Sequence, residues 1–282
     1  MSITGKTKLY GLVGIPIKHS FSPAMHNQFF DKKKIDGVYV CFEMNGETFK
    51  SIKQSILTLG VQGFNVTVPY KEKIISKLDV IDKEASIIGA VNTVVVRNGK
   101  LKGYNTDGIG FIASLKEKVK FDPKGKYVVV LGAGGASRAV GCYLLKEKVA
   151  FLGLYDVDTK KVNDLAKHLR AHYPKMCVHV YSSSSEICLK NVDLLVNATG
   201  LGRKTTDHKV IDYKKIHKKV LVYDLIYNPT DPELLKAAKK KGCKTMNGLW
   251  MLIYQGLKAE EIWQGKKFPN AEKILLEGIK NV

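Results

Sequence analysis

Three glycines within four positions, Gly132, Gly134 and Gly135, precede a stretch whose composition favours a helix. Glycine leaves backbone N–H groups uncovered, and such groups at the start of a helix can bind the oxygens of a pyrophosphate. Gly132 would permit a tight turn, and the other two glycines would let phosphate groups approach the backbone. A plain turn in an α/β sheet does not require three glycines, so the pattern indicates an anion-binding turn.

An acidic residue stands at the distance from this turn that a ribose would require. The apolar run 127–131 resembles a strand buried on both faces, residues 136–147 favour a helix, and a second apolar run, 151–155, ends at Asp156. A carboxylate about 20 residues after the first glycine can accept hydrogen bonds from both hydroxyls of an adenosine ribose. The arrangement predicts a Rossmann-type dinucleotide site, although Ser137 replaces the third glycine of the fingerprint.

Polar residues also gather where strands of the first hundred residues are expected to end, at 19–22, 65–71, 92–93 and 105–108. In open α/β sheets, ligands bind beyond the carboxyl ends of the strands. Each residue alone has a local explanation: Ser22 can cap a helix at Pro23, Lys71 can be a solvated lysine, and Asp107 can form a turn. A purely structural interpretation needs all of these local explanations to hold at once, which is the less favoured outcome. The set therefore predicts a second, polar ligand site.

The hydrophobic pattern places these residues on alternating strands and helices. In the first part, expected strands are 9–14, 37–42, 61–68, 91–96 and 101–104, and expected helices start at Pro23 and span 49–59 and 71–78. Asn98-Gly99 predicts a hairpin and hence a mixed sheet. Further strands are expected at 177–180, 192–196 and 220–225, with helices around 162–169 and 249–263. We predict a mixed-sheet α/β domain, 1–107 completed by 249–282, and a parallel-sheet Rossmann domain, 108–248.

Composition limits the function classes. The chain has 282 residues, 45% of them hydrophobic and 26% charged, and no stretch approaches the roughly 20 apolar residues of a membrane-spanning helix. The five cysteines are dispersed and no signal-peptide core precedes them, so we expect a cytoplasmic protein with reduced thiols and no metal site. The net charge of +20 is spread along the chain, which favours a solvated basic surface over a nucleic-acid interface.

Several short motifs, taken together, resemble the shikimate dehydrogenase family, including its quinate/shikimate branch. The resemblance covers nearly the whole chain and implies two domains, an active-site cleft between them, and hydride transfer between a nicotinamide and ring C3 of a cyclic hydroxy acid. In chain order the motifs are Ser20-x-Ser22-Pro23, Asn65-Val66-Thr67-Val68-Pro69-x-Lys71, Gly89-Ala90-Val91-Asn92-Thr93, Asn105-Thr106-Asp107-Gly108, Gly132-x-Gly134-Gly135-Ala136, Asn197-Ala198-Thr199, Asp224-Leu225-Ile226-Tyr227-Asn228-Pro229 and Gly248-x-x-Met251-Leu252-x-x-Gln255.

The resemblance also implies roles for individual residues. Lys71 and Asp107 match the catalytic pair, and Ser20 and Ser22 match the anchors of the substrate carboxylate. Positions that hold the ring hydroxyls or the carboxylate match Asn65, Thr67, Asn92, Tyr227 and Gln255. Positions around the cofactor match Gly132, Ala133, Gly134, Gly135, Ala136, Asp156, Thr199, Leu225, Gly248 and Met251. Met251 and Gln255 are four apart, so they would lie on one face of a helix.

The chain departs from the family in ways that bear on its cofactor. Asp156-Val157-Asp158 replaces the Asn-Arg-Thr that many members carry after the second Rossmann strand, and Trp250 replaces a small residue or an acid. We therefore predict that NAD is preferred and NADP remains possible. The alternatives are a strictly shikimate-specific, NADP-dependent enzyme and a ligand-sensing homologue without catalysis. We expect a monomer or a homodimer without nucleic-acid or membrane partners.

Overall fold

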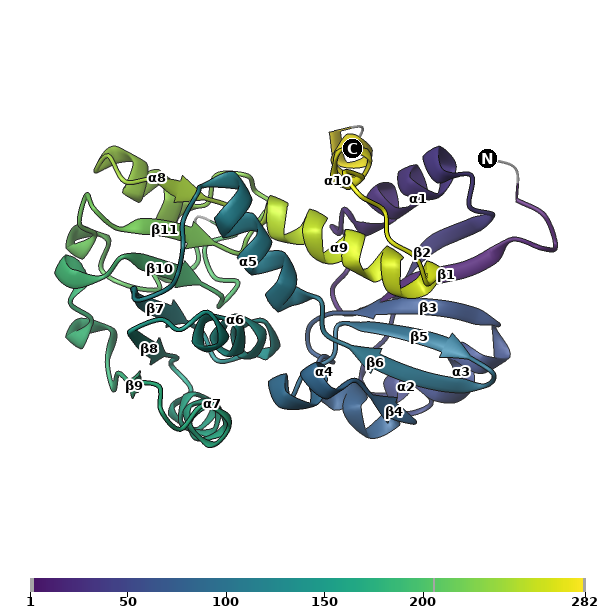
Figure 1. The fold of residues 1–282 in the computed structure, drawn as a ribbon, viewed down its shortest axis with the longest axis horizontal. Helices are drawn as coiled ribbons and strands as arrows, with labels where there is room; N and C mark the ends of the chain where they lie inside the picture. Colours follow the sequence, from purple (N-terminus) through teal and green to yellow (C-terminus); the bar gives the residue numbers. More distant parts are fainter. Residues whose placement is uncertain (1–2, 205, 281–282) are drawn as a thin grey trace. The chain divides into compact units, whose positions relative to one another are not determined.

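The computed structural model describes residues 3–204 and 206–280, and the chain divides into two compact units (Figure 1). One unit contains the chain up to Gly110 together with the chain from Ile253 onward, and the other runs from Phe111 to Leu252. Two helices, α5 (Asp107–Lys118) and α9 (Leu249–Gln264), therefore include residues of both units. Each unit is built on its own six-stranded sheet, which confirms the predicted α/β class.

The first unit has a mixed sheet in the order β2-β1-β3-β5-β6-β4. Strand β1 pairs in parallel with β2 and β3, whereas β5 is antiparallel to both β3 and β6. The predicted hairpin is confirmed: Asn98 and Gly99 have φ of 51° and 72°, the left-handed conformation that a tight two-residue turn requires. The strands are β1 (Lys8–Gly14), β2 (Gly37–Glu43), β3 (Val61–Val66), β4 (Val80–Ile81), β5 (Thr93–Arg97) and β6 (Lys100–Tyr104).

Side chains that alternate along these strands pack into separate layers. Val13 and Phe64 belong to a buried cluster with Ile52 and Ile56 of α3. The Tyr10 ring instead lies 5.3 Å from the Trp263 ring of α9. The helices of this unit are α1 (Ser22–Lys33), α2 (Gly46–Lys50), α3 (Ile52–Thr58), the 3₁₀ helix η1 (Lys73–Lys77), α4 (Lys83–Ile88) and α10 (Glu272–Lys280).

Some element boundaries differ from the prediction. The single helix expected over 49–59 is two helices that meet at Ser51, and α2 starts earlier because Asn45 accepts hydrogen bonds from the N–H groups of Glu47 and Thr48. The helix expected over 71–78 is the short 3₁₀ helix η1, and β3 ends at Val66 rather than at residue 68. The prediction also lacked α4, β4 and α10. Helix α4 and strand β4 are too short to carry a clear hydrophobic period, whereas α10 does have Leu275 and Ile279 at helical spacing, and the prediction did not use that signal.

The second unit has the predicted parallel sheet, in the order β12-β11-β10-β7-β8-β9. Figure 1 labels the strands from β11 to β9. Its strands are β7 (Tyr127–Leu131), β8 (Phe151–Tyr155), β9 (Val178–Val180), β10 (Leu194–Asn197), β11 (Leu221–Asp224) and β12 (Thr245–Met246). Its helices are α6 (Gly135–Lys146), α7 (Thr159–His172) and α8 (Glu233–Lys240), with the 3₁₀ helices η2 (Ser184–Glu186), η3 (Leu189–Asn191) and η4 (Tyr213–Lys215). The strand order reverses between β7 and β10, and ligands of such sheets bind beyond the carboxyl ends at this point.

Candidate active site

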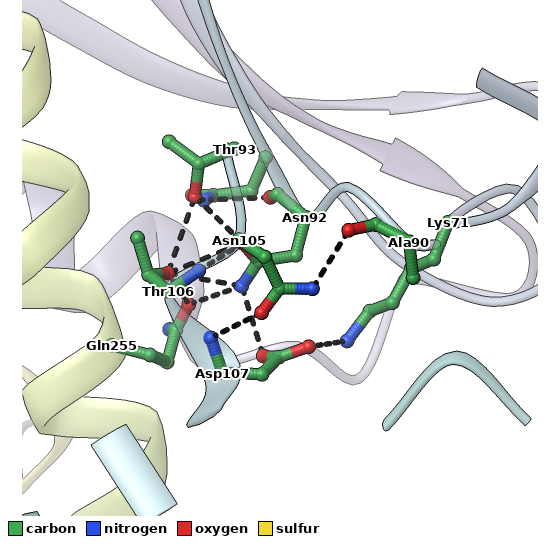
Figure 2. Close-up of polar contacts among 9 residues, drawn as sticks. Lys71, Ala90, Asn92, Thr93, Asn105, Thr106, Asp107 and Gln255 are labelled. Carbon is green, nitrogen blue, oxygen red and sulfur yellow. Dashed lines mark hydrogen bonds and ion pairs between the residues drawn. The ribbon is translucent and has the colours of Figure 1, made fainter. Parts of the chain in front are cut away.

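Lys71 and Asp107 form an ion pair in the first unit. The Lys71 Nζ lies 2.6 Å from Asp107 Oδ2, and their side chains are only 15% and 6% exposed (Figure 2). Lys71 lies beyond the end of β3, and Asp107 is the first residue of α5, where the helix dipole favours a negative charge. Lys71 is therefore not simply a solvated lysine, and Asp107 does more than form a turn.

Asn92 holds the carboxylate of this pair. Its Nδ2 donates to Asp107 Oδ1 over 2.8 Å, and its Oδ1 accepts from the Thr106 N–H over 2.8 Å. Asn92 Nδ2 also lies 3.2 Å from Gln255 Oε1, so α9 contributes to the same cluster (Figure 2). The Thr106 N–H fixes the Asn92 side chain through its Oδ1, so its Nδ2 is aimed at Asp107. Asn92 thus orients Asp107 Oδ1, the oxygen that Lys71 does not contact.

Two threonines and a second asparagine complete the cluster and were not assigned roles from the sequence. Thr93 and Thr106 are fully buried, and their hydroxyls lie 3.3 Å apart. Asn105 donates from Nδ2 to the Ala90 carbonyl, and its Oδ1 accepts from the Asp107 N–H (Figure 2). All three stand inside the recognised motifs. Their position next to Asn92 or Asp107 in the sequence is the signal that could have assigned them to the site.

The predicted substrate residues of this unit occupy three places. Asn65 is buried beside the cluster and donates to the Asn92 carbonyl and the Thr93 hydroxyl, both over 3.1 Å. Ser20 and Ser22 lie together, with their hydroxyl oxygens 3.2 Å apart. Thr67 follows β3, and its N–H donates to the Val13 carbonyl. The structure thus brings Lys71, Asn92, Asp107, Gln255 and Asn65 into one network and groups the two serines with each other.

Ser22 does not cap helix α1, as one interpretation of the sequence held. The helix begins at Ser22 itself, its N-cap residue is Phe21, and the Ser22 N–H donates a hydrogen bond to the Ser20 hydroxyl over 3.2 Å. The Ser22 hydroxyl instead accepts a hydrogen bond from the Ser20 hydroxyl. Both hydroxyls therefore stand at the N-terminus of α1, where the helix dipole favours an anion.

The glycine turn of the second unit starts helix α6 after β7. Gly132 has φ of 103°, and a Cβ there would lie 2.9 Å from the Ala198 carbonyl carbon, so this position requires glycine. A Cβ at Gly134 would meet nothing within 4 Å, which leaves the backbone of the turn open to a ligand. Ser137, in the third fingerprint position, is fully buried. Gly135 and Ala136 are the first residues of α6, so their N–H groups fit a pyrophosphate.

Asp156 lies against this turn. Its Oδ2 accepts a hydrogen bond from the Ala133 N–H over 2.7 Å, and its Oδ1 accepts from the Asp158 N–H over 2.9 Å. Each carboxylate oxygen has two lone pairs, so both retain the capacity to accept from a ribose hydroxyl. Asp158 caps α7 and pairs with Lys161 over 3.1 Å. The residues present therefore fit the adenosine half of a dinucleotide.

The remaining predicted cofactor positions follow β10, β11 and β12. Thr199 donates from its hydroxyl to Asn197 Oδ1 over 2.7 Å, and the Leu201 N–H donates to the Thr199 hydroxyl oxygen. A Cβ at Gly248 would lie 2.0 Å from the Leu225 carbonyl oxygen, so only glycine permits this approach. Met251 is buried on α9, and Tyr227 is half-buried after β11.

In the part of the chain that the structure describes, no three His, Cys, Asp or Glu side chains form a possible metal site, and no helix is long and apolar enough to cross a membrane.

Asp224, at the end of β11, is fully buried. Burial raises the pKa of its carboxyl from the ordinary 3.8 to about 6, although hydrogen bonds from the Asn197 side chain and the Ile226 N–H and the charge of Arg203 oppose the rise. Asn197 also accepts from Thr199, so Asp224 supports the loop that follows β10. The sequence placed this residue in a motif without suggesting that its carboxyl titrates near neutral pH.

The chain has close relatives among the shikimate dehydrogenases. Residues 12–94 match the profile of the shikimate dehydrogenase substrate binding domain. A shikimate dehydrogenase (NADP(+)) of Caldanaerobacter subterraneus is 43% identical over 270 residues, which cover 95% of each chain. The crystal structure of shikimate dehydrogenase from Aquifex aeolicus has a TM-score of 0.90 and 40% identity, and the match covers 99% of this chain and 100% of that one.

A second solved structure has a different enzyme name and contains NAD. Quinate dehydrogenase from Corynebacterium glutamicum in complex with NAD has a TM-score of 0.87 and 31% identity, with 98% of this chain and 99% of that chain covered. The name of the Caldanaerobacter relative specifies NADP(+) instead. The closely related curated proteins therefore support NADP better than they support our predicted preference for NAD.

We predict that Asp224→Asn flattens the dependence of stability on pH. A raised carboxyl pKa means that the folded protein favours the protonated form, so wild-type stability falls as the pH rises from about 4 to about 6. A pKa shift of about two units corresponds to about 3 kcal/mol of stability that the wild type loses over this pH range. The variant should not show this loss, although its altered hydrogen bonds should change its stability by the same amount at every pH. The measurement is the free energy of unfolding in urea across this range.

Asp164→Asn is the matched control, because Asp164 is an exposed aspartate on α7 of the same unit. Its stability should follow the wild-type pH dependence. Parallel curves for wild type and Asp224→Asn would show that the buried carboxyl does not titrate in this range.

Proposed function

Because the chain belongs to the shikimate dehydrogenase family, we propose that it catalyses reversible hydride transfer between a nicotinamide dinucleotide and the C3 hydroxyl of shikimate, quinate or both. The observation that carries the proposal is the Lys71–Asp107 pair at 2.6 Å, set in a buried network of amide and hydroxyl groups. A titratable cation held beside neutral hydrogen-bonding side chains suits a substrate that has several hydroxyls and loses or gains one proton.

Lys71 moves the proton in this proposal. A nicotinamide dinucleotide held by the glycine turn and Asp156 would accept the hydride from C3 when the hydroxyl is oxidised, and so would supply the redox chemistry. The hydroxyl proton passes to the neutral amine of Lys71 as the C–O bond becomes a carbonyl. In the reverse direction the Lys71 ammonium donates its proton to the oxygen that becomes negative. Asp107 keeps the Lys71 Nζ in place over 2.6 Å, and Asn92 keeps Asp107 in place.

Most of the proposed substrate residues belong to the first unit, whereas Tyr227 belongs to the second. Ser20 and Ser22 would bind the carboxylate of the substrate, since their hydroxyls are adjacent and stand at the N-terminus of α1. Asn65, Asn92 and Gln255 would bind its ring hydroxyls, because their amides already form one network around the catalytic pair. Thr67 and Tyr227 complete the proposed set by their motif positions alone.

A ligand-sensing protein without catalysis is the alternative. It would need the same hydrogen-bonding groups but would not need a lysine paired with a carboxylate beside them. Initial rates for shikimate and for quinate, each with NAD and with NADP, distinguish the two. We expect turnover of at least one acid; absence of turnover for all four combinations, with the acids still bound, would favour the sensing protein.

We predict that Lys71→Ala lowers kcat by about a hundredfold or more, because general acid–base groups contribute at least this much. Dissociation constants for the cofactor should stay unchanged, since Lys71 belongs to the unit that lacks the glycine turn. The measurements are steady-state kinetics and cofactor titration. Lys73→Ala is the control, because Lys73 is an exposed lysine two residues away and should retain wild-type kcat. Near-wild-type kcat in Lys71→Ala would remove Lys71 from the mechanism.

We propose further that Asp156 makes NAD the better cofactor. Its carboxylate can accept from the 2′-hydroxyl of NAD, whereas the 2′-phosphate of NADP removes that donor and adds negative charge. Two like charges about 4 Å apart repel by about 4 kcal/mol at an effective dielectric of 20, and screening reduces this value. Lys161 could offset the repulsion, but it is paired with Asp158. We expect kcat/KM to favour NAD by about tenfold to a thousandfold.

Asp156→Asn should reduce this ratio by about tenfold or more, because the variant lacks the repelling charge. Asp158→Asn, two residues away, releases Lys161 but leaves Asp156 intact, and it should change the ratio less. The measurement is kcat/KM for both cofactors in all three proteins. A wild type that uses NADP as well as NAD would refute the preference and would agree with the name of the Caldanaerobacter relative.

A further inference from the structure

A buried acid–imidazole pair lies in the first unit, outside the catalytic cluster. His26 of α1 and Glu260 of α9 are both fully buried, and His26 Nδ1 lies 2.6 Å from Glu260 Oε1. Removing two such groups from water costs several kcal/mol per ion, and apolar side chains of similar volume usually give equal or greater stability. Stability alone therefore does not explain the pair, and its surroundings suggest what else it does.

The imidazole lies flat against a tyrosine. The His26 and Tyr39 ring centroids are 4.4 Å apart with an interplanar angle of 15°, and the Trp263 ring lies 5.3 Å from His26. Among the residues described, His26 Nε2 has no hydrogen-bond partner, so the bond to Glu260 is the polar contact that fixes the rotation of the ring. Glu260 thus sets the orientation of the surface on which Tyr39 stacks.

Tyr39 connects the His26–Glu260 pair to the proposed substrate residue Asn65. Its hydroxyl donates to Asn65 Oδ1 over 2.9 Å, and Asn65 donates in turn to the Asn92 carbonyl. The backbone of Tyr39 is fixed from the same helix as His26, because its N–H donates to Asn27 Oδ1 and its carbonyl accepts from Asn27 Nδ2. Asn27 of α1 therefore holds the backbone of Tyr39, and the preceding residue, His26, packs against the face of its ring.

The same pair also joins the two helices that carry proposed substrate groups. His26 lies one turn after Ser22 on α1, and Glu260 lies on α9 beyond Gln255. A Cβ at Gly256 would lie 2.5 Å from the terminal methyl carbon of Met25, so α9 lies close to α1 at this point and a larger residue there would displace the Met25 side chain. Burial raises the pKa of Glu260 and the bond to His26 lowers it, but a hydrogen bond joins the two groups whichever of them holds the proton.

We propose that Glu260 is a positioning residue for substrate binding, acting through His26 and Tyr39 on the side chain of Asn65. The inference rests on the proposed function, in which Asn65 binds a ring hydroxyl. Glu260 touches no reacting atom, and its effect is to keep the Tyr39 hydroxyl aimed at Asn65. Loss of the pair should therefore weaken binding of the acid while leaving the proton transfer and the cofactor site intact.

The test is a double-mutant cycle on Tyr39 and Glu260. Tyr39→Phe removes the bond to Asn65 and should raise KM for the acid about fivefold to tenfold, with kcat changed less than about twofold. Glu260→Leu should raise the same KM about threefold to tenfold, and the double variant should match Tyr39→Phe alone, because both changes act through one bond. KM for the cofactor should stay at the wild-type value in all three variants.

Two variants separate positioning from a general loss of stability. Glu260→Gln keeps an oxygen that can accept from His26, so it should restore KM to within about twofold of wild type. Glu261→Leu removes the neighbouring carboxylate, which pairs with Lys258 and Lys267, and should leave KM for the acid unchanged. Should Glu260→Leu fail to fold, His26→Leu/Glu260→Leu replaces both buried polar groups and should raise KM in the same way.

A second readout does not depend on turnover. The side-chain amide resonances of Asn65, assigned by their loss in Asn65→Asp, should move in Glu260→Leu toward their positions in Tyr39→Phe and stay in place in Glu261→Leu. A wild type that turns over neither acid would refute the proposed function, and these resonances would still test the positioning. Unmoved resonances, or effects of the two substitutions on KM that multiply, would overturn the proposal.

Discussion

The ion pair between Lys71 and Asp107 is the constraint on which the first unit depends. Both side chains are largely removed from water, and removing one partner of such a pair leaves an uncompensated charge that costs about 3–5 kcal/mol. The surrounding groups are therefore not interchangeable. Asn92 donates to the second oxygen of Asp107 and Gln255 lies next to Asn92, so the charge is surrounded by hydrogen-bonding groups from a strand end, a helix start and a second helix.

This constraint explains the arrangement of the mixed sheet. Lys71 follows β3, Asn92 precedes β5, and Asp107 follows β6, while β5 lies between the other two and antiparallel to both. An antiparallel strand brings its starting end to the carboxyl ends of its neighbours. The hairpin at Asn98-Gly99 is thus necessary for the site, because it reverses the chain so that Asn92 and Asp107 meet at one edge.

The sequence predicted what depends on local patterns. The glycine turn, the acid at 156, the hairpin and both sheet types follow from residue type and spacing, and the order of eight motifs identified the family. Contacts between distant positions have no such signal. The bond between His26 and Glu260 joins residues 234 positions apart, and that of Tyr39 to Asn65 joins strands that are not neighbours in the sheet. The capping role considered for Ser22 was wrong, because α1 starts at Ser22 and not at Pro23. Sequence patterns do not locate a helix start to within one residue.

Three aspartates at the ends of strands or starts of helices show why residue type alone does not fix a role. Asp107 faces an ammonium, and Asp156 accepts two backbone N–H groups. Asp224 is buried with an amide and an N–H, and burial raises its pKa to about 6. The first arrangement positions a cation, the second leaves free lone pairs on both carboxylate oxygens, and the third raises the pKa of the carboxyl toward neutral pH. Each role follows from which donors the fold brings to the carboxylate, and the motifs specify those donors only where they are adjacent in the sequence.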